Sequence, residues 1–227
     1  GTVVTFVAEM VGDTVPQLTL WEPDAYKDTI NSYTLYEGIV LGIAGLLAVF
    51  LTILFVVKGS AMFPATAALA WAIMGYICVD FGFIGKIVSL DPGDLNIWRA
   101  GSEVFLAASL VIFFYAYLHL NRWNTRYNYL VLTWLIGLLI LFGIAVIAPA
   151  YAAGIARISF ALAAVFGLIV ILILSWRGFD RAILLIPTWC LILAWVAAGW
   201  LTITGRLDND IVQPALGGGL VLIIMLI

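Results

Sequence analysis

The sequence predicts an all-α integral membrane protein, with a bundle of seven transmembrane helices preceded by a short extracytoplasmic β segment. Hydrophobic residues make up 65% of the 227 residues and charged residues only 10%, whereas soluble domains are about half apolar. From Leu35 onward the chain divides into seven apolar runs, each near the ~20 residues that cross a bilayer as a helix. The runs are continuously apolar rather than alternating, which excludes a transmembrane β-barrel.

Residues 1–34 are more polar than the rest of the chain and are expected to face water. Thr2–Met10 and Gln17–Trp21 read as two strands of a hairpin. Because an isolated hairpin is unstable in water, we expect these strands to complete a β sensor domain that begins before Gly1. Glu22–Thr34 is then a polar linker, in which proline and asparagine disfavour a long helix or strand.

Residues 35–227 form the predicted seven-helix transmembrane domain. The expected spans are Leu35–Val57, Met62–Lys86, Ile97–His119, Tyr127–Ala148, Ala152–Trp176, Arg181–Thr204 and Ile211–Ile227. Short polar or Gly- and Pro-containing turns separate them. The last run is still apolar at Ile227, so we expect its helix to be truncated there and the protein to continue.

The distribution of Lys and Arg predicts the orientation. With the N terminus outside, Lys58, Arg122, Arg126, Arg177 and Arg181 lie on the cytoplasmic side, and Lys86, Arg99, Arg157 and Arg206 lie on the external side. The counts on the two sides are nearly even, and we expect this arrangement under the positive-inside rule, which concerns Lys and Arg rather than net charge. An odd number of spans then places the C terminus in the cytoplasm. The net charge of −3 argues against a nucleic-acid partner.

Six ionisable residues in the outer third of the predicted helices are the candidate site. They are Glu37, Asp80, Lys86, Arg99, Glu103 and Arg157. Charges inside a bilayer are costly and by default mark functional sites. Arg99 and Glu103 are one helical turn apart and can pair, while Asp80 and Arg157 are expected to meet partners across the bundle. The set reads as a polar cavity that takes a small ligand, or as a latch between two packings; alternatively, these groups reach the hydrated interface.

Other chemistry finds little support in the sequence. His119 is the only histidine, so a metal site lacks ligands, and no catalytic residue or cofactor is expected. A retinal protein needs a Lys in its last helix, and Ile211–Ile227 has none. Five tryptophans could line a chromophore pocket or simply pack helices together, and Gly217–Gly219 could be a hinge or a packing notch. Packing is favoured in both cases.

Three short strings suggest a known family. They are Leu18-Thr19-Leu20-Trp21 before the linker, Leu35-Tyr36-Glu37-Gly38-Ile39-Val40-Leu41-Gly42-Ile43 opening the first span, and Arg177-Gly178-Phe179-Asp180-Arg181-Ala182 between the fifth and sixth spans. With this layout the chain resembles the bacterial seven-transmembrane receptors with diverse intracellular signalling modules. The resemblance implies an external jelly-roll sensor, a place in the bacterial inner membrane, and a cytoplasmic diguanylate cyclase, cyclic-di-GMP phosphodiesterase or histidine kinase.

The function expected from these observations is a non-catalytic transmembrane signalling module. Its partners would be the lipid bilayer, a small external ligand, an effector domain in the same polypeptide and a second copy in a homodimer. The alternative is a membrane enzyme or transporter, or an accessory subunit of a larger membrane complex. The absence of an internal repeat in the sequence weighs against a transporter.

Overall fold

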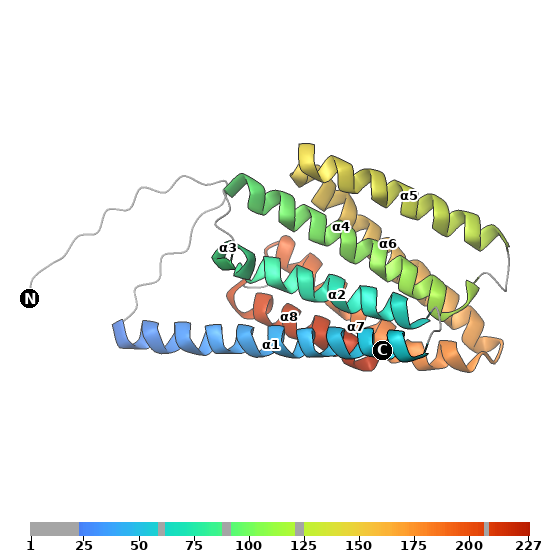
Figure 1. Cartoon of the computed structure of the whole chain (residues 1–227), viewed down its shortest axis with the longest axis horizontal. Helices are drawn as coiled ribbons and strands as arrows, with labels where there is room; N and C mark the ends of the chain where they lie inside the picture. Colours follow the sequence, from blue (N-terminus) through green and yellow to red (C-terminus); the bar gives the residue numbers. More distant parts are fainter. Residues whose placement is uncertain (1–22, 59–61, 88–91, 121–124, 207–208) are drawn as a thin grey trace, which may run out of the picture. The chain divides into compact units, whose positions relative to one another are not determined.

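The computed structural model describes residues 23–58, 62–87, 92–120, 125–206 and 209–227, and these residues are helical apart from short turns (Figure 1). The helices are α1 (Pro23–Lys58), α2 (Met62–Asp80), α3 (Phe83–Ile87), α4 (Pro92–Tyr117), α5 (Thr125–Ile147), α6 (Pro149–Trp176), α7 (Asp180–Ile203) and α8 (Asn209–Leu226). The predicted β-hairpin lies outside the described residues.

The chain divides into two compact units, Gly1–Leu35 and Tyr36–Ile227. In the first unit the structure describes the beginning of α1, which corrects the expected linker because the chain is helical from Pro23. Proline is tolerated in the first helical turn, where its missing N–H has no intrahelical partner. Asp24 in the same turn interacts favourably with the helix dipole.

Among the described residues, six helices are long and apolar enough to cross a membrane: α1, α2, α4, α5, α6 and α7. They coincide with the first six predicted spans, except that α2 ends at Asp80 rather than continuing to Lys86. Gly82 there has a φ of +70°, a left-handed conformation that only glycine adopts at low cost, and the chain resumes as the short helix α3. The seventh predicted span corresponds to α8, whose apolar part is the shorter segment Ala215–Leu226, so the count of seven stays a prediction.

Within the second unit α4 is the central helix. It packs against α2, α5 and α6, while α7 lies between α6 and α8, and α8 returns to α2 (Figure 1). The result is a ring of α2, α4, α6, α7 and α8, with α5 outside it on α4 and α6. Residues of α1 reach α2 through the Trp71 indole N–H, which donates to the Thr52 hydroxyl at 2.9 Å.

Small residues bring the core helices close together. The buried face of α6 repeats small residues three or four positions apart: Ala152, Ala156, Ser159, Ala163 and Gly167. The buried Trp189 of α7 fills the notch, since a Cβ added to Gly167 would lie 2.5 Å from its indole. Close approach through small residues is how membrane helices gain packing energy without a hydrophobic driving force between them.

The turn between α6 and α7 explains the Arg-Gly string in the sequence. Gly178 has a φ of +78°, and the Phe179 N–H donates to the Leu174 carbonyl at 3.1 Å. These are the features of a glycine-capped helix end. The cap lets α7 begin directly at Asp180, whose acidic side chain lies in the first turn.

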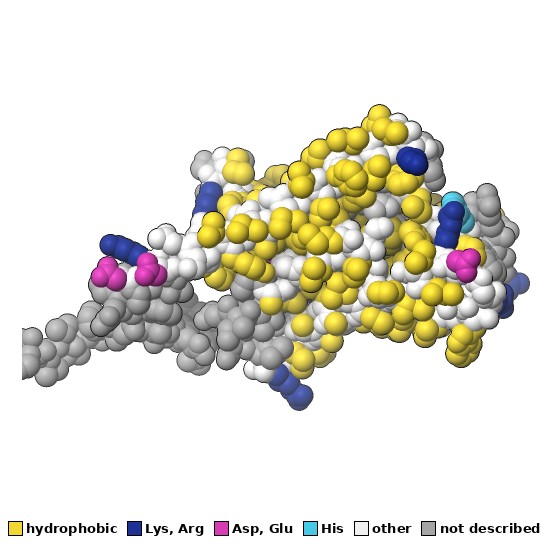
Figure 2. Space-filling model, turned by 90° about the horizontal axis from the view of Figure 1, so that it is seen from below, with side chains coloured by type: hydrophobic (Ala, Val, Ile, Leu, Met, Phe, Trp, Pro, Cys, Tyr) yellow, Lys and Arg dark blue, Asp and Glu magenta, His cyan; other side chains and the backbone are white. Residues whose placement is uncertain are grey.

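Large hydrophobic side chains face outward over most of the bundle. On the face drawn in Figure 2, hydrophobic side chains cover most of the broad part of the molecule. Helices α1 and α5 carry strongly exposed side chains, with Leu46 at 73% and Leu139 also at 73%. A soluble protein rarely exposes so large an apolar surface. The exposed surface is therefore that of a multi-pass membrane protein, in agreement with the six apolar helices.

Candidate functional site

Four of the six predicted site residues form one continuous chain of ion pairs. Asp80, the last residue of α2, accepts a hydrogen bond from Arg99 of α4 at 3.2 Å. Arg99 Nε lies 3.7 Å from Glu103 one turn later on α4, and Glu103 in turn binds Arg157 of α6. This ionic chain, Asp80–Arg99–Glu103–Arg157, joins the three helices that pack side by side in the centre of the fold.

The Glu103–Arg157 pair is the strongest link in the ionic chain. Arg157 donates from Nε to Oε2 at 2.8 Å and from a terminal nitrogen to Oε1 at 2.7 Å, which is the bidentate geometry of a charge-assisted pair. The Glu103 side chain is only 6% exposed, against 45% for Arg157. A buried carboxylate needs such a partner, because an uncompensated charge there is strongly destabilising.

The link between Asp80 and Arg99 is more accessible to solvent. The Arg99 side chain is 51% exposed, and its partner Asp80 is 13% exposed. An exposed ion pair contributes little to stability, so this link can break and re-form at lower cost than the Glu103–Arg157 pair. The ionic chain thus has one firmly held end and one labile end.

Aromatic residues also lie close to the ionic chain: Tyr76, which the sequence analysis did not single out, and Trp195, one of the five tryptophans weighed there. Tyr76, one turn before Asp80 on α2, is within electrostatic range of all four charges. Its ring meets Trp195 of α7 edge-on at 6.3 Å, and Trp195 also meets Phe160 of α6 at 5.5 Å. The signal for Tyr76 was its i, i+4 spacing from Asp80, which places both on one helix face.

The other two predicted residues do not join the ion pairs. Glu37 of α1 is buried, at 8% exposed, and lies within electrostatic range of Lys86 and Asp80. Lys86 is exposed on α3, with its ammonium 5.2 Å from the centre of the Phe83 ring. Both therefore lie at the Asp80 end of the ionic chain without a direct contact to it.

The tryptophans serve packing rather than a pocket. Four indole N–H groups donate hydrogen bonds across pairs of neighbouring helices: Trp71 to Thr52 (2.9 Å), Trp134 to Ser159 (2.7 Å), Trp189 to the Ala164 carbonyl (2.8 Å) and Trp195 to the Leu216 carbonyl (2.9 Å). Trp200 is 65% exposed. These bonds tie α2 to α1, α5 to α6, and α7 to both α6 and α8. The packing interpretation of these residues is the one that the contacts support.

Metal and histidine chemistry gain no support from the geometry. His119 follows α4 with a left-handed φ of 48°, a conformation typical of helix ends. Among the residues whose positions are described, no group of three or more His, Cys, Asp or Glu side chains could hold a metal ion. The ionic chain is therefore the site from which function is argued.

The comparisons with known proteins agree with this architecture. Residues 33–227 match the family described as 7TM diverse intracellular signalling. No curated protein matches the chain, and no solved structure does. The match covers all the described helices except the first residues of α1, and it fits the apolar, multi-helix fold. The chain thus belongs to the 7TM diverse intracellular signalling family, a family of membrane signalling receptors.

Proposed function

We propose that this chain is the membrane domain of a receptor that transmits an external signal to a cytoplasmic effector in the same polypeptide. The ionic chain across α2, α4 and α6 carries the proposal. Such a chain favours one relative position of three helices, and it ends in a half-exposed pair that an input can disturb. A ligand can then shift the helices only through its differential affinity for two packings.

The proposed topology has seven spans, with the N terminus outside and the C terminus in the cytoplasm of the bacterial inner membrane. The 18 residues of α8 are about 27 Å long at 1.5 Å per residue, against a ~30 Å hydrocarbon thickness, and the apolar segment Ala215–Leu226 is the shorter part of that length. Counting α8 as the seventh span places the ionic chain toward the outer face and the end of α8 toward the cytoplasm.

The input and output are proposed from the family. The input is a small external ligand, sensed by a β domain to which residues 1–22, before α1, contribute the end. The output is a diguanylate cyclase, cyclic-di-GMP phosphodiesterase or histidine kinase, and the receptor acts as a homodimer. The sequence that follows Ile227 discriminates among the alternatives: an effector domain there supports the receptor, and a stop codon favours an accessory subunit.

The test is the output of the full-length receptor carrying Asp80→Asn, which breaks the outer ion pair to Arg99 while changing little in volume. We expect altered effector output, measured as cyclic-di-GMP level or autophosphorylation, at wild-type amounts in the membrane. Asp94→Asn is the matched control, because Asp94 is an exposed carboxylate in the first turn of α4, outside the ionic chain. Wild-type output from Asp80→Asn, with or without ligand, would contradict the proposal.

A further inference from the structure

Three consecutive glycines of α8 each meet an aromatic side chain from a different part of the fold. A Cβ added to Gly217 would lie 2.6 Å from Phe81, one on Gly218 would lie 2.6 Å from the Tyr36 hydroxyl, and one on Gly219 would lie 3.3 Å from Trp195. Real Cβ contacts essentially never fall below 3.0 Å. The glycines are thus a packing notch, as the sequence analysis favoured, and three aromatic rings hold α8 at this level.

The same aromatic rings are linked to the ionic chain. Phe81 directly follows Asp80. Trp195 donates its indole N–H to the Leu216 carbonyl of α8 at 2.9 Å, and it packs on Phe160, three residues after Arg157 on α6. The Asp80 end of the ionic chain therefore adjoins a ring at the glycine notch, and the Arg157 end is linked to another ring there, Trp195, through Phe160.

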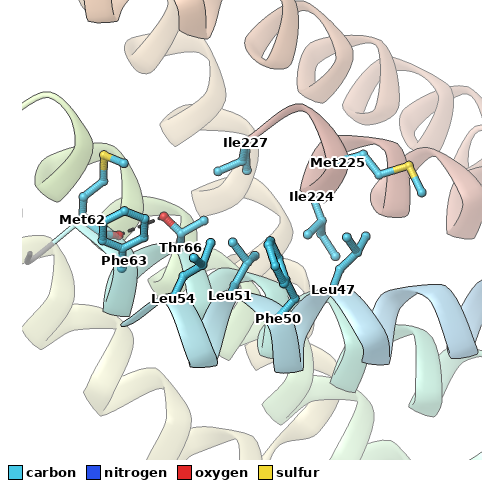
Figure 3. Close-up of a pocket in the computed structure, with 10 residues that line it drawn as sticks. All are labelled: Leu47, Phe50, Leu51, Leu54, Met62, Phe63, Thr66, Ile224, Met225 and Ile227. Atoms are coloured by element: carbon cyan, nitrogen blue, oxygen red, sulfur yellow. Dashed lines mark hydrogen bonds between the residues drawn. The ribbon is translucent and has the colours of Figure 1, made fainter. Parts of the chain in front are cut away.

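Beyond the notch, the last turns of α8 border free space. An apolar cavity of about 230 Å³ lies among α1, α2 and α8, lined on the α8 side by Ile224, Met225 and Ile227. Figure 3 shows Ile224 pointing across it toward Leu47 and Phe50 of α1. A polar contact to the last turn of α8 is long, with the Thr188 hydroxyl of α7 3.5 Å from the Leu226 carbonyl.

We infer that α8 is a lever: the aromatic rings grip it at Gly217–Gly219, and its last turns move into or out of the cavity when the ionic chain rearranges. A helix is stiff over a few turns, so a small displacement at the notch is carried to the residues two turns later. The side chains that line the cavity are apolar except for Thr66, whose hydroxyl donates to the Met62 carbonyl at 2.8 Å. The inference rests on the proposed function for its purpose, but its test is a distance.

The test measures the distance between spin labels at Trp176→Cys on α6 and Leu226→Cys on α8, in a full-length protein with Cys78→Ser and Cys190→Ser. Both labelled positions are exposed, at 88% and 52%. Asp80→Asn is expected to shift or broaden the α6–α8 distance distribution. A second label pair, Trp176→Cys with Tyr129→Cys on α5, is expected to stay unchanged in the same variant.

The contact between α8 and Phe81 is tested by Gly217→Ala. Phe81 is buried, so it has little space into which it can move away from the added methyl group. This variant is expected to displace the α8 label, and Gly217→Ala with Phe81→Leu is expected to return it toward the wild-type distance. Gly199→Ala on α7, where nothing lies within 4 Å of the added Cβ, is the matched control and should leave the distance unchanged. An unaltered α8 distance in both Asp80→Asn and Gly217→Ala would overturn the lever.

Failure of the lever and failure of the proposed function give different results. If Asp80→Asn moves α8 but leaves effector output at the wild-type level, the lever stands and the signalling role of the ionic chain falls. If output changes while the α8 distance does not, the signalling role stands and the lever is wrong.

Discussion

Among single residues, the contrast between the two ends of the ionic chain is the feature that most constrains function. Glu103 is buried and bound in two places by Arg157, whereas Arg99 is half exposed and binds Asp80 through one 3.2 Å contact. Removing one partner of a buried pair leaves an uncompensated charge, which costs about 3 kcal/mol or more. Removing one partner of an exposed pair costs about 1 kcal/mol or less.

We therefore predict that Arg157→Leu lowers the free energy of unfolding by about 3 kcal/mol, and that Arg99→Leu lowers it by about 1 kcal/mol or less. Glu103→Leu combined with Arg157→Leu should recover much of the loss, because neither charge is then left buried alone. Reversible unfolding in mixed micelles measures all three values. Equal losses for the two arginine variants would show that the ends of the chain do not differ in this way.

The spacing of charged residues predicted part of this site. The i, i+4 relation of Arg99 and Glu103 was readable from the sequence, and the pairing is present. That Asp80 and Arg157 meet this same pair depends on α4 lying between α2 and α6, which no local pattern specifies. Tyr76 was missed for the same reason, and Trp195 was weighed only as a pocket or packing residue, since an aromatic residue in a membrane helix gives no sign of which neighbour it faces.

At the level of helices, the contacts of α7 with α6 and of α8 with its neighbours place a glycine against a large aromatic side chain. The packing of α7 on α6 depends on Gly167, which gives the buried Trp189 its place, and on the bond from Trp189 to the Ala164 carbonyl at 2.8 Å. The same arrangement recurs between α8 and its neighbours at Gly217–Gly219. At these points the fit of an aromatic side chain against glycine therefore fixes how far one helix is shifted along the other. The indole hydrogen bonds stabilise the same arrangement.

Gly167→Ala is expected to lower the free energy of unfolding by about 1–3 kcal/mol, the usual cost of overpacking a core. Its control is Gly154→Ala in the same helix, where nothing lies within 4 Å of the added Cβ and the higher helix propensity of alanine is unopposed. Both values come from the same unfolding measurement. If the Gly167→Ala protein were as stable as the Gly154→Ala protein, the packing of α7 on α6 would not depend on Trp189 fitting against Gly167.

Helix boundaries were largely predictable because hydrophobic length and turn residues act locally. Leu35–Val57 and Ala152–Trp176 were placed within a few residues of where α1 and α6 end. The predicted helix boundaries were wrong where the effect of a proline or a glycine on the helix was misjudged. Pro23 opens α1 instead of preventing it, and the left-handed Gly82 ends α2 earlier than the apolar run suggested.

For the whole molecule, the family match indicates a signalling domain, and the six apolar helices of the described residues fit its place in a membrane. The proposed function adds a direction of signalling across that membrane. The ionic chain must lie toward the external face and the end of α8 toward the cytoplasm if an outside ligand is to act on an inside effector. Helix connectivity fixes which residues share a side: Asp94 lies at the Arg99 end of α4, and Arg177 lies at the far end of α6.

Cysteine labelling in intact cells measures which side of the membrane each end of the helices faces. In a Cys78→Ser and Cys190→Ser background, Asp94→Cys and Arg177→Cys each offer one exposed thiol, and a membrane-impermeant maleimide is added before or after permeabilisation. We expect Asp94→Cys to be labelled in intact cells, and Arg177→Cys to be labelled only after permeabilisation. The reverse pattern would place the ionic chain on the cytoplasmic side and contradict the direction of signalling proposed for this receptor.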